Sequence, residues 1–396
     1  MPSRAAAGLG RASVLLDYSA RHWLSGWWLN FRRLIFVVIV LAFMVALAGF
    51  VPAMRFQATA AYDNAGYAVR VNGLLTEANV AKLERQTGLA GASMSLVSTP
   101  VVAGGRTSTV DLYLGRKASD QSRIWFTKAL RVSGRPVRSA GGDEIALDWI
   151  SAKALRVGPG DRVSLVSPLN KEQRFRATVV GVYASSGPTR KAAFVAPGAF
   201  TEAFAASYVA GSPDQEPALY SDVFFGTRGP NEKAAAAKVE EVGQSNSELL
   251  IEPRATKAAR VRRDAAELVG PAADRLIPGL AGLVLIVVLL REQHHRLRRR
   301  RQEMGLLVSF GFGPGAVRRM VVGETVLEAA IGGVLAIPLG RWLLAEQFQL
   351  YLPREAVTAM RVDLIVVLAL VAVLGLIQVR WLMARYALKD LIEGER

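Results

Sequence analysis

The feature that most constrains this chain is a hydrophobic segment that runs directly into a block of arginines. Leu276 to Leu290 carries no charge, and residues 291–301 read REQHHRLRRRR. Cations gathered at the end of an apolar helix mark its cytoplasmic side, because the positive-inside bias acts through Lys and Arg close to the helix end. The chain is therefore expected to be a membrane protein, and the residues directly after the arginine block are expected at the inner face of the membrane.

Composition supports this class and removes several others. A net charge of +16 together with 51% hydrophobic residues is ordinary for a membrane protein with arginine-rich inner loops. No long basic run occurs outside the membrane-proximal segments, so nucleic acid is not expected as a partner. The absence of cysteine excludes disulfides, thiolate metal sites and cysteine nucleophiles. His22, His294 and His295 all fall on the predicted inner side, and the adjacent pair is not expected to bind a metal.

Four hydrophobic segments are predicted to cross the membrane, since a helix needs roughly 20 residues to do so. They are residues 34–54, 265–290, 321–345 and 362–384. The flanking arginines all fall on one side of these segments: Arg32, Arg33, the block at 291–301, Arg318, Arg319, Arg380 and Arg385. Both termini are therefore predicted in the cytoplasm, with 346–361 as a short external loop and 385–396 as a cytoplasmic tail.

The first hydrophobic segment is interpreted as an anchor that is retained. Ala46-Leu47-Ala48 has the spacing that signal peptidase reads, but the region before the apolar core and the core itself are too long for a secretory signal. Residues 1–33 are predicted to hold a cytoplasmic amphipathic helix, because apolar residues from Leu16 to Phe31 follow one helix face. A helix lying in the membrane interface and one packed on the membrane segments are equally open.

Residues 55–264 are predicted to form a large extracytoplasmic α+β domain. Near its start we expect a strand at 67–71 and a helix at 76–86, and near its end a strand at 222–225, a helix at 231–242 and a strand at 248–251. Two strand-helix-strand units flanking an insertion can pair into one ferredoxin-like, porter-type subdomain. The chain would then enter and leave the same subdomain.

The insertion is predicted to be a β-rich subdomain. A short helix at 148–156 is followed by the turn at 158–160, and strands at 162–166 and 174–183 are expected to pair. Apolar residues alternate with Arg174 and Arg176 along the second strand, which describes a sheet with one buried face. The arginines are interpreted as a solvated face, with an anionic headgroup site as the alternative.

Residues 301–340 carry a resemblance to a known family. The segments RQEMGLLVSFG (301–311), RRMVVGE (318–324) and IGGVLAIPLG (331–340) resemble the hallmark of MacB/FtsX-type ABC transporter permeases. The external stretch 146–165, closing with VVGV at 179–182, is similar to the periplasmic core domain of that family. Residues 55–63 weakly resemble the DevC and HrtB branch of efflux permeases. Phe312 departs from the family's usual alanine, and Ala336 from its common glycine.

The resemblance implies that the cytoplasmic segment 291–320 contains a coupling helix for an ATPase. The candidate coupling residues are Glu303, Met304, Gly305, Leu307, Phe310 and Gly311. Met304, Leu307 and Phe310 lie near one face of this helix and are expected to dock in a cleft of the ATPase. Gly305 and Gly311 would permit close backbone approach and a tight exit. An interfacial helix without a partner is the alternative.

Two further sets of residues stand out in the segment 321–345. Gly332, Gly333 and Gly340 offer a small-residue face for transmembrane packing. Glu324 and Glu328 lie one turn apart, and ionisable residues at membrane depth are functional candidates by default. Arg318 and Arg319 lie within reach of these carboxylates, which favours a salt-bridged helix start.

The chain lacks the Gly-x-x-x-x-Gly-Lys-Ser/Thr motif, so it is not expected to be an enzyme or to bind a cofactor of its own. ATP and Mg would be bound by a partner ATPase. The resemblance implies a permease subunit of a MacB-type ABC transporter in the bacterial cytoplasmic membrane, which extrudes a hydrophobic or amphipathic substrate. It would pair with a second permease copy or a paralogue, in contact with membrane lipid.

In this family the energy is implied to pass by mechanotransmission through a long second helix. We expect one helical stalk from Arg254 to Leu290, with Pro278 as its main interruption. The alternative function is an FtsX-like signalling subunit that activates extracellular cell-wall hydrolases. The sequence does not identify the substrate. It also leaves open whether the permease forms a homodimer or a heterodimer, and whether a periplasmic adaptor and an outer-membrane duct take part.

Overall fold

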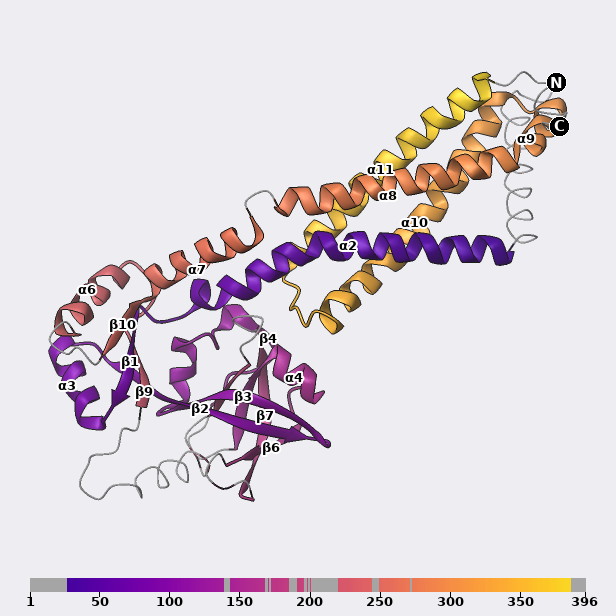
Figure 1. The fold of residues 1–396 in the computed structure, drawn as a ribbon. Helices are drawn as coiled ribbons and strands as arrows, with labels where there is room; N and C mark the ends of the chain where they lie inside the picture. Colours follow the sequence, from indigo (N-terminus) through magenta and orange to yellow (C-terminus); the bar gives the residue numbers. More distant parts are fainter. Residues whose placement is uncertain are drawn as a thin grey trace, which may run out of the picture. The chain divides into compact units, whose positions relative to one another are not determined.

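The computed structural model describes residues 27–138, 143–184 apart from 168, 169 and 171, 191–200 apart from 196, 197 and 199, 220–243, 249–270 and 273–385. The chain divides into two compact units (Figure 1). The helical unit comprises the described residues up to Pro52, those of 271–348 and those from Leu352 onward. The β-rich unit comprises 53–270 and 349–351.

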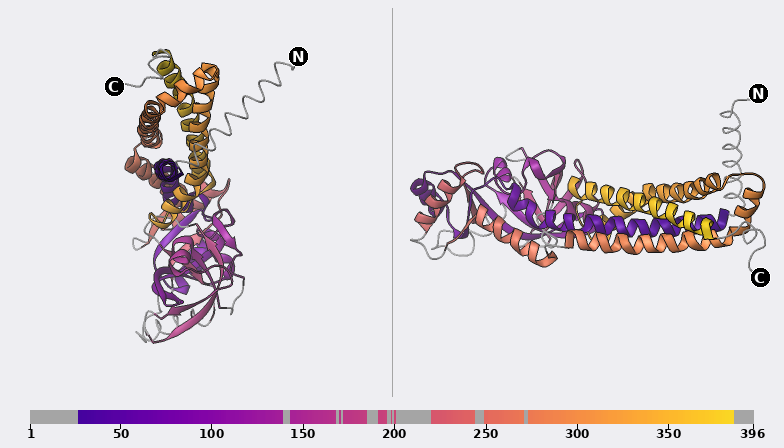
Figure 2. Two further views of the ribbon diagram at one scale, coloured as in Figure 1. Left: turned by 90° about the vertical axis from the view of Figure 1, so that its right-hand side faces the viewer. Right: turned by 90° about the horizontal axis from the view of Figure 1, so that it is seen from above.

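Long helices build the helical unit. They are α2 (Trp27–Asn64, whose last part belongs to the β-rich unit), α8 (Ala273–Arg299), α10 (Pro314–Glu346) and α11 (Arg354–Arg385), with the short α9 (Arg301–Ser309) between α8 and α10. Within the unit α8 packs on α11 and α11 packs on α10, and Figure 2 shows these helices running alongside one another. Residues 1–26 and 386–396, which contain most of the predicted amphipathic helix and the tail, lie outside the described residues.

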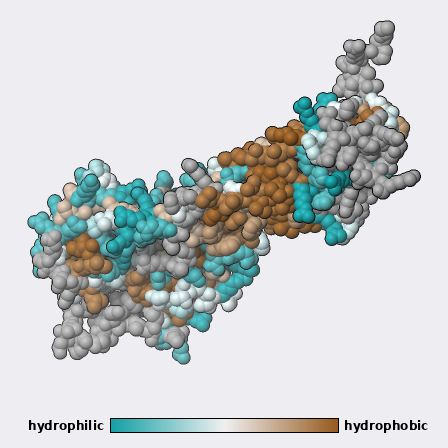
Figure 3. Space-filling model, turned by 45° about the horizontal axis from the view of Figure 1, so that its top comes forward, coloured by the Kyte–Doolittle hydropathy of each residue, from teal (hydrophilic) through white to brown (hydrophobic). Residues whose placement is uncertain are grey.

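Three described helices are long and apolar enough to cross a membrane: Leu34–Asn64, Gly315–Glu346 and Arg354–Trp381. Apolar side chains cover their outer surface, and Figure 3 shows hydrophobic residues gathered over the helical unit on the face in view. A helix that is hydrophobic all round is typical of a membrane span. Leu280, Val284 and Val287 of α8 are also exposed, but several side chains of this helix lie outside the described part, and a fourth span stays a prediction.

The prediction of one continuous stalk from Arg254 to Leu290 is wrong. Helix α7 (Arg254–Val269) ends at Gly270, whose φ is +72°, and α8 starts only at Ala273. Glycine adopts positive φ without strain, and the proline after it in the sequence cannot continue a helix. The interruption lies here and not at Pro278, which lies inside α8.

The two ends of the β-rich unit meet in one sheet, as predicted. Strand β1 (Val69–Leu75) pairs antiparallel with both β9 (Tyr220–Phe225) and β10 (Leu250–Pro253). Helices α3 (Glu77–Thr87) and α6 (Glu232–Gly243) pack against each other beside this sheet (Figure 1). The Thr76 side chain accepts a hydrogen bond from the Asn79 N–H, and Gly88 ends α3 at a φ of +66°, so both predicted helix signals operate.

The insertion forms a closed ring of strands. They are β2 (Gly91–Ala103), β3 (Arg106–Gly115), β5 (Glu144–Asp148), β6 (Arg162–Val166), β7 (Arg174–Tyr183) and β8 (Ala192–Val195), with β4 (Arg131–Gly134) added on β7. The order β2-β3-β8-β5-β7-β6 returns to β2 through the pairing of Val101 with Leu165. The first residues of β2 also pair with β9, so one sheet runs through both parts. The insertion is thus continuous with the subdomain that it interrupts.

The interior of the ring is a separate hydrophobic core. Its buried side chains include Val101, Leu112, Leu147, Leu165 and Val179. Helix α4 (Trp149–Leu155) packs on β3, and the short 3-10 turns η1 (Ala118–Arg123) and η2 (Lys128–Leu130) lie between β3 and β4. The predicted pairing of β6 with β7 is confirmed, since Leu165 lies opposite Phe175. Arg174 and Arg176 are exposed, whereas Ala177 is buried, as the alternation predicted.

A buried ion pair joins β1 to β9. Arg70 Nε donates to Asp222 Oδ1 at 2.6 Å, and the Asp222 side chain has no exposed surface. Asn72 Nδ2 donates to the same oxygen at 3.0 Å, and Arg70 also reaches Glu252 on β10 at 3.4 Å. The charge of Asp222 is therefore balanced by one cation and by further hydrogen bonds.

Replacement of Asp222 by alanine is expected to lower the free energy of unfolding by about 1.5–3 kcal/mol, because Arg70 and Asn72 would lose their charged acceptor and Arg70 would keep only its longer contact with Glu252. The matched control is Glu77→Ala, which removes the exposed pair with Arg116 and is expected to cost at most about 1 kcal/mol. Urea unfolding of the full chain in detergent measures both losses. Equal losses would show that the buried pair does not hold the sheet together.

Candidate functional site

Helix α9 is held against the helical unit by a hydrophobic cluster. Its buried members are Met304 and Leu307 of α9, Val317, Val321 and Val322 of α10, and Val379 of α11. Met304 is 2% exposed and Leu307 8%. Burial of one such side chain contributes about 1.5–3 kcal/mol. The α9 helix is therefore a fixed part of the bundle, packed on α10 and on the end of α11.

Met304 and Leu307 do not form the docking face predicted from the sequence, because their own chain covers them. The exposed apolar residues of this segment are Leu306, at 48%, and Phe310, at 75%. These two lie four residues apart and so project from one side of the helix. Apolar residues occupy both faces of the second half of α9, with Met304 and Leu307 on one face and Leu306 on the other, so the sequence pattern could not distinguish the face that packs inward from the face that points outward. Of the predicted docking anchors, only Phe310 is available to a partner.

A tight turn connects α9 to α10. Gly311 has a φ of +86° and its N–H donates to the Val308 carbonyl, while the Phe312 N–H donates to the Leu307 carbonyl at 3.1 Å. Gly313 then caps α10, with proline in its first turn. Phe312, which stands where the resembled family has alanine, packs partly buried against the cluster of α9 and α10. Gly305 is buried in the middle of α9.

A buried arginine fixes the start of α9 to α10. Arg300 Nε donates to Glu303 Oε2 at 2.9 Å and Nη1 donates to Glu324 Oε2 at 2.5 Å, and the arginine side chain is only 8% exposed. Burial lowers the pKa of Arg300, but the carboxylates of Glu324 and Glu303 outweigh it and the pKa lies above its usual value. Glu324 thus forms a salt bridge with Arg300, a partner that the sequence analysis did not name, while a pairing of Glu324 with Arg318 or Arg319 stays a prediction. We call Arg300, Glu303 and Glu324 together the Arg300 clamp.

The three glycines of α10 lie at contacts with other helices. A Cβ on Gly332 would lie 2.8 Å from Val37 Cγ1, and one on Gly340 would lie 2.9 Å from the backbone oxygen of Ala42, both on α2. A Cβ on Gly333 would lie 3.3 Å from Leu368 of α11. Glycine at these positions allows α10 to approach α2 and α11 closely.

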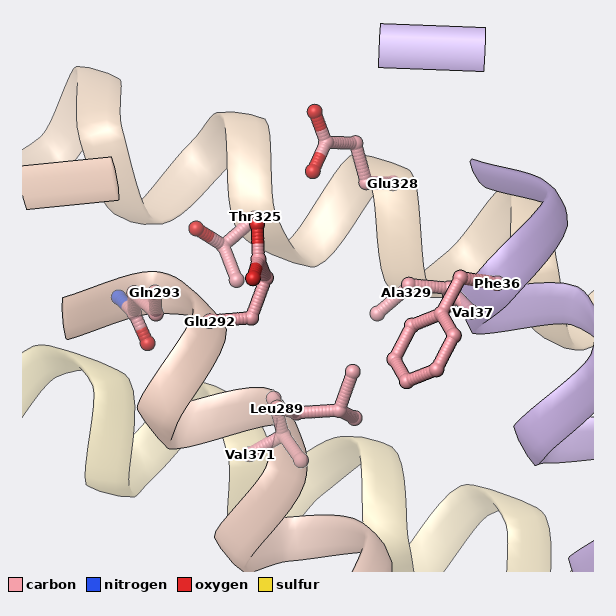
Figure 4. Close-up of a pocket in the computed structure, with 9 residues that line it drawn as sticks. All are labelled: Phe36, Val37, Leu289, Glu292, Gln293, Thr325, Glu328, Ala329 and Val371. Atoms are coloured by element: carbon pink, nitrogen blue, oxygen red, sulfur yellow. The ribbon is translucent and has the colours of Figure 1, made fainter. Parts of the chain in front are cut away.

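The other candidate carboxylate, Glu328, lines a cavity of the helical unit together with Glu292, Gln293 and Thr325 (Figure 4). Within the part of the chain that the structure describes, no group of three or more His, Asp or Glu side chains could hold a metal ion. The expected lack of a metal and of a cofactor stays a prediction.

The close approach of α10 to α2 predicts opposite effects of one substitution at two glycines. Gly323 lies in the same helix with no atom within 4 Å of an added Cβ, so Gly323→Ala should stabilise the helix by about 1 kcal/mol. Gly340→Ala should lower the melting temperature of the full chain in detergent, because its methyl group meets the α2 backbone. Equal shifts in the two variants would contradict the contact.

The C-terminal part of the chain matches the model of a known protein family. The family model of the FtsX-like permease C-terminal domain matches residues 275–389, which contain most of α8 and all of α9, α10 and α11. No curated protein matches the chain.

Two solved structures resemble the chain at low sequence identity. One is the extracellular domain of the noncanonic ABC-type transporter YknZ from Gram-positive bacteria, at 14% identity over 47% of this chain and 99% of that chain, with a TM-score of 0.31. The other is a domain of a putative permease protein from Porphyromonas gingivalis, at 12% identity over 48% of this chain and 89% of that chain, with a TM-score of 0.30.

Proposed function

Because residues 275–389 match the FtsX-like permease family, we propose that this chain is the permease subunit of a MacB-type ABC transporter. A separate ATPase hydrolyses ATP, and the permease converts this into outward movement of a hydrophobic or amphipathic substrate. A second permease copy or a paralogue completes the membrane part. The β-rich unit lies outside the cytoplasmic membrane, and the turn from α8 to α10 lies inside.

The observation that carries the proposal is an exposed aromatic side chain on a helix that is otherwise fixed by its own chain. Phe310 is 75% exposed beside Leu306. Buried aromatic residues dominate the binding energy of protein interfaces, and Phe310 would fill a pocket of the ATPase. Since the chain lacks a phosphate-binding loop, the nucleotide must be bound by that partner.

The packing of α9 converts docking at Phe310 into a force on the membrane helices. The hydrophobic cluster joins α9 to Val317 and Val321 of α10, and the Arg300 clamp joins its start to Glu324 on the same helix. A push on Phe310 therefore moves α9 and α10 together. Glu324 serves this connection in our proposal and has no role in binding substrate.

Helix α2 is the continuous element that carries this movement to the β-rich unit. It runs without a break over 38 residues, about 57 Å at 1.5 Å per residue, whereas the path from α8 to α7 is interrupted at Gly270. Its last turns contribute Ala60 and Ala61 to the core of the β-rich unit. Phe56 also packs on Tyr351 of the loop between α10 and α11, with ring centroids 5.7 Å apart. This modifies the mechanotransmission path predicted from the sequence.

Replacement of Phe310 by aspartate is expected to weaken co-purification of the ATPase at least tenfold without changing the melting temperature of the permease. The matched control is Ser309→Asp, which adds the same charge at the adjacent exposed position and keeps the aromatic ring. Leu307→Asp is expected to lower the melting temperature instead, because it buries a carboxylate in the cluster of α9 and α10.

Undiminished ATPase binding by the Phe310→Asp variant would exclude the docking role. In cells, the Phe310→Asp variant also distinguishes the proposed transport function from the FtsX-like signalling alternative. Retained substrate inside the cell is expected for a transporter, whereas the FtsX-like alternative predicts a loss of cell-wall hydrolysis with no retained substrate.

A further inference from the structure

A cavity lies inside the helical unit where four helices meet (Figure 4). Its lining residues are Phe36 and Val37 of α2, Leu289, Glu292 and Gln293 of α8, Thr325, Glu328 and Ala329 of α10, and Val371 of α11. The Arg300 clamp and the apolar cluster of α9 involve none of these side chains. The cavity is therefore a feature separate from the proposed ATPase contact.

The cavity contains a buried amide that lacks a partner. Gln293 is 3% exposed, and neither its Oε1 nor its Nε2 has a hydrogen-bond partner among the described residues. Gly375 of α11 makes room for it, since a Cβ there would lie 3.0 Å from Oε1. Burying an amide without a partner is costly, so such groups in proteins are nearly always satisfied by water or by a ligand.

The two sides of the cavity differ in chemistry. Figure 4 shows Glu292, Gln293 and Thr325 on one side, and Phe36 with Ala329 on the other. The Thr325 hydroxyl donates to the Val321 carbonyl at 3.1 Å, so its oxygen keeps lone pairs that can accept.

The polar side thus offers several acceptors together with negative charge. The carboxylates of Glu292 and Glu328 line the same cavity as the amide oxygen of Gln293 and the hydroxyl of Thr325. This combination suits a cation that donates several hydrogen bonds. The apolar side suits hydrocarbon.

The size of the cavity limits the cation. Its volume is about 40 Å³, and one water needs about 10–15 Å³ on the same measure. The cavity therefore has room for about three waters, which is enough for a primary ammonium. A trimethylammonium group is larger and has no N–H to donate to the polar side. Phe36 is 47% exposed, so an attached hydrocarbon chain can continue along its ring to the surface of the bundle.

We propose that this cavity binds the primary ammonium head of an amphiphile. The three N–H donors reach Gln293 Oε1, Thr325 Oγ1 and a carboxylate of Glu292 or Glu328, and the chain lies against Phe36 and Leu289. The amphiphile is either an aminophospholipid of the membrane or a free long-chain amine, which share this chemistry. The site goes beyond the proposed transport function and does not depend on the ATPase.

Binding of n-dodecylamine and of dodecyltrimethylammonium to the full chain in neutral detergent, measured by calorimetry, tests the proposal. The two probes share one hydrocarbon chain and one charge. At least tenfold tighter binding of the primary amine is expected, because only its head can donate hydrogen bonds to the polar side of the cavity. Equal affinities would overturn the site, since they would indicate unspecific hydrophobic binding.

Variants locate the binding. Gln293→Leu and Glu328→Gln should each weaken dodecylamine binding at least tenfold, whereas Glu346→Gln, at an exposed position near the end of the same α10 helix, should leave it unchanged. Removal of an unpartnered amide should not lower the melting temperature, so a loss of binding in Gln293→Leu would not reflect misfolding. Glu328→Gln provides the test if the first variant fails to fold. Unchanged affinity in the folded variants would overturn the proposal.

Lipid nanodiscs distinguish the two sources of the ammonium group. Weaker dodecylamine binding in discs that contain phosphatidylethanolamine than in discs of phosphatidylcholine alone would identify the lipid head as the natural occupant. Equal binding in the two kinds of disc would assign the site to free amines. Either result keeps the ammonium site, and because no ATPase is present, neither depends on the docking of Phe310.

Discussion

A helix in hydrocarbon must satisfy its backbone hydrogen bonds within itself, so a membrane-spanning segment stays helical along its whole length. Because α2 stays helical beyond that length, it connects the two units, and the rest of the structure depends on it. Its 38 residues exceed the roughly 20 that a membrane requires, so the helix continues into the β-rich unit without a loop. Ala60 and Ala61 are buried there, while Gly332 and Gly340 of α10 approach its earlier turns. One continuous helix therefore belongs to both hydrophobic cores.

Two different kinds of interaction fix helix α9 to the helical unit. Met304 and Leu307 bury apolar surface, which gives strength without direction, and Arg300 adds directed hydrogen bonds to Glu303 and Glu324. Among the described apolar residues of this segment, Leu306 and Phe310 remain exposed on the opposite side. A helix held in this way can receive a partner and pass the force on, because it does not need to fold when the partner binds.

Local signals in the sequence were reliable, and long-range pairings were not. Thr76 and Gly88 delimit α3, and the strands around Leu165 and Phe175 pair, because capping and hairpin pairing depend on neighbouring residues. Glu324 pairs with Arg300, which lies 24 residues before it, because the fold and not the sequence spacing decides that this arginine is buried beside it. Some features could have been found in the sequence and were missed. Gly104 and Gly105, both at positive φ, form the two-residue turn between β2 and β3, and a Gly-Gly pair is a recognised hairpin signal. By contrast, the closure of the ring by β6 on β2 and the face that α9 buries depend on tertiary contacts, which periodicity alone does not specify.

The central claim is that movement passes along α2 and not along the interrupted path from α8 to α7. Paired glycine substitutions test it, since each glycine lowers helix stability by about 1 kcal/mol. Export per ATP hydrolysed is measured for Ala58→Gly with Thr59→Gly in α2, and for Ala259→Gly with Ala266→Gly in α7. The account predicts a loss of export in the α2 variant and normal export in the α7 variant. Normal export in the α2 variant together with a loss in the α7 variant would contradict it.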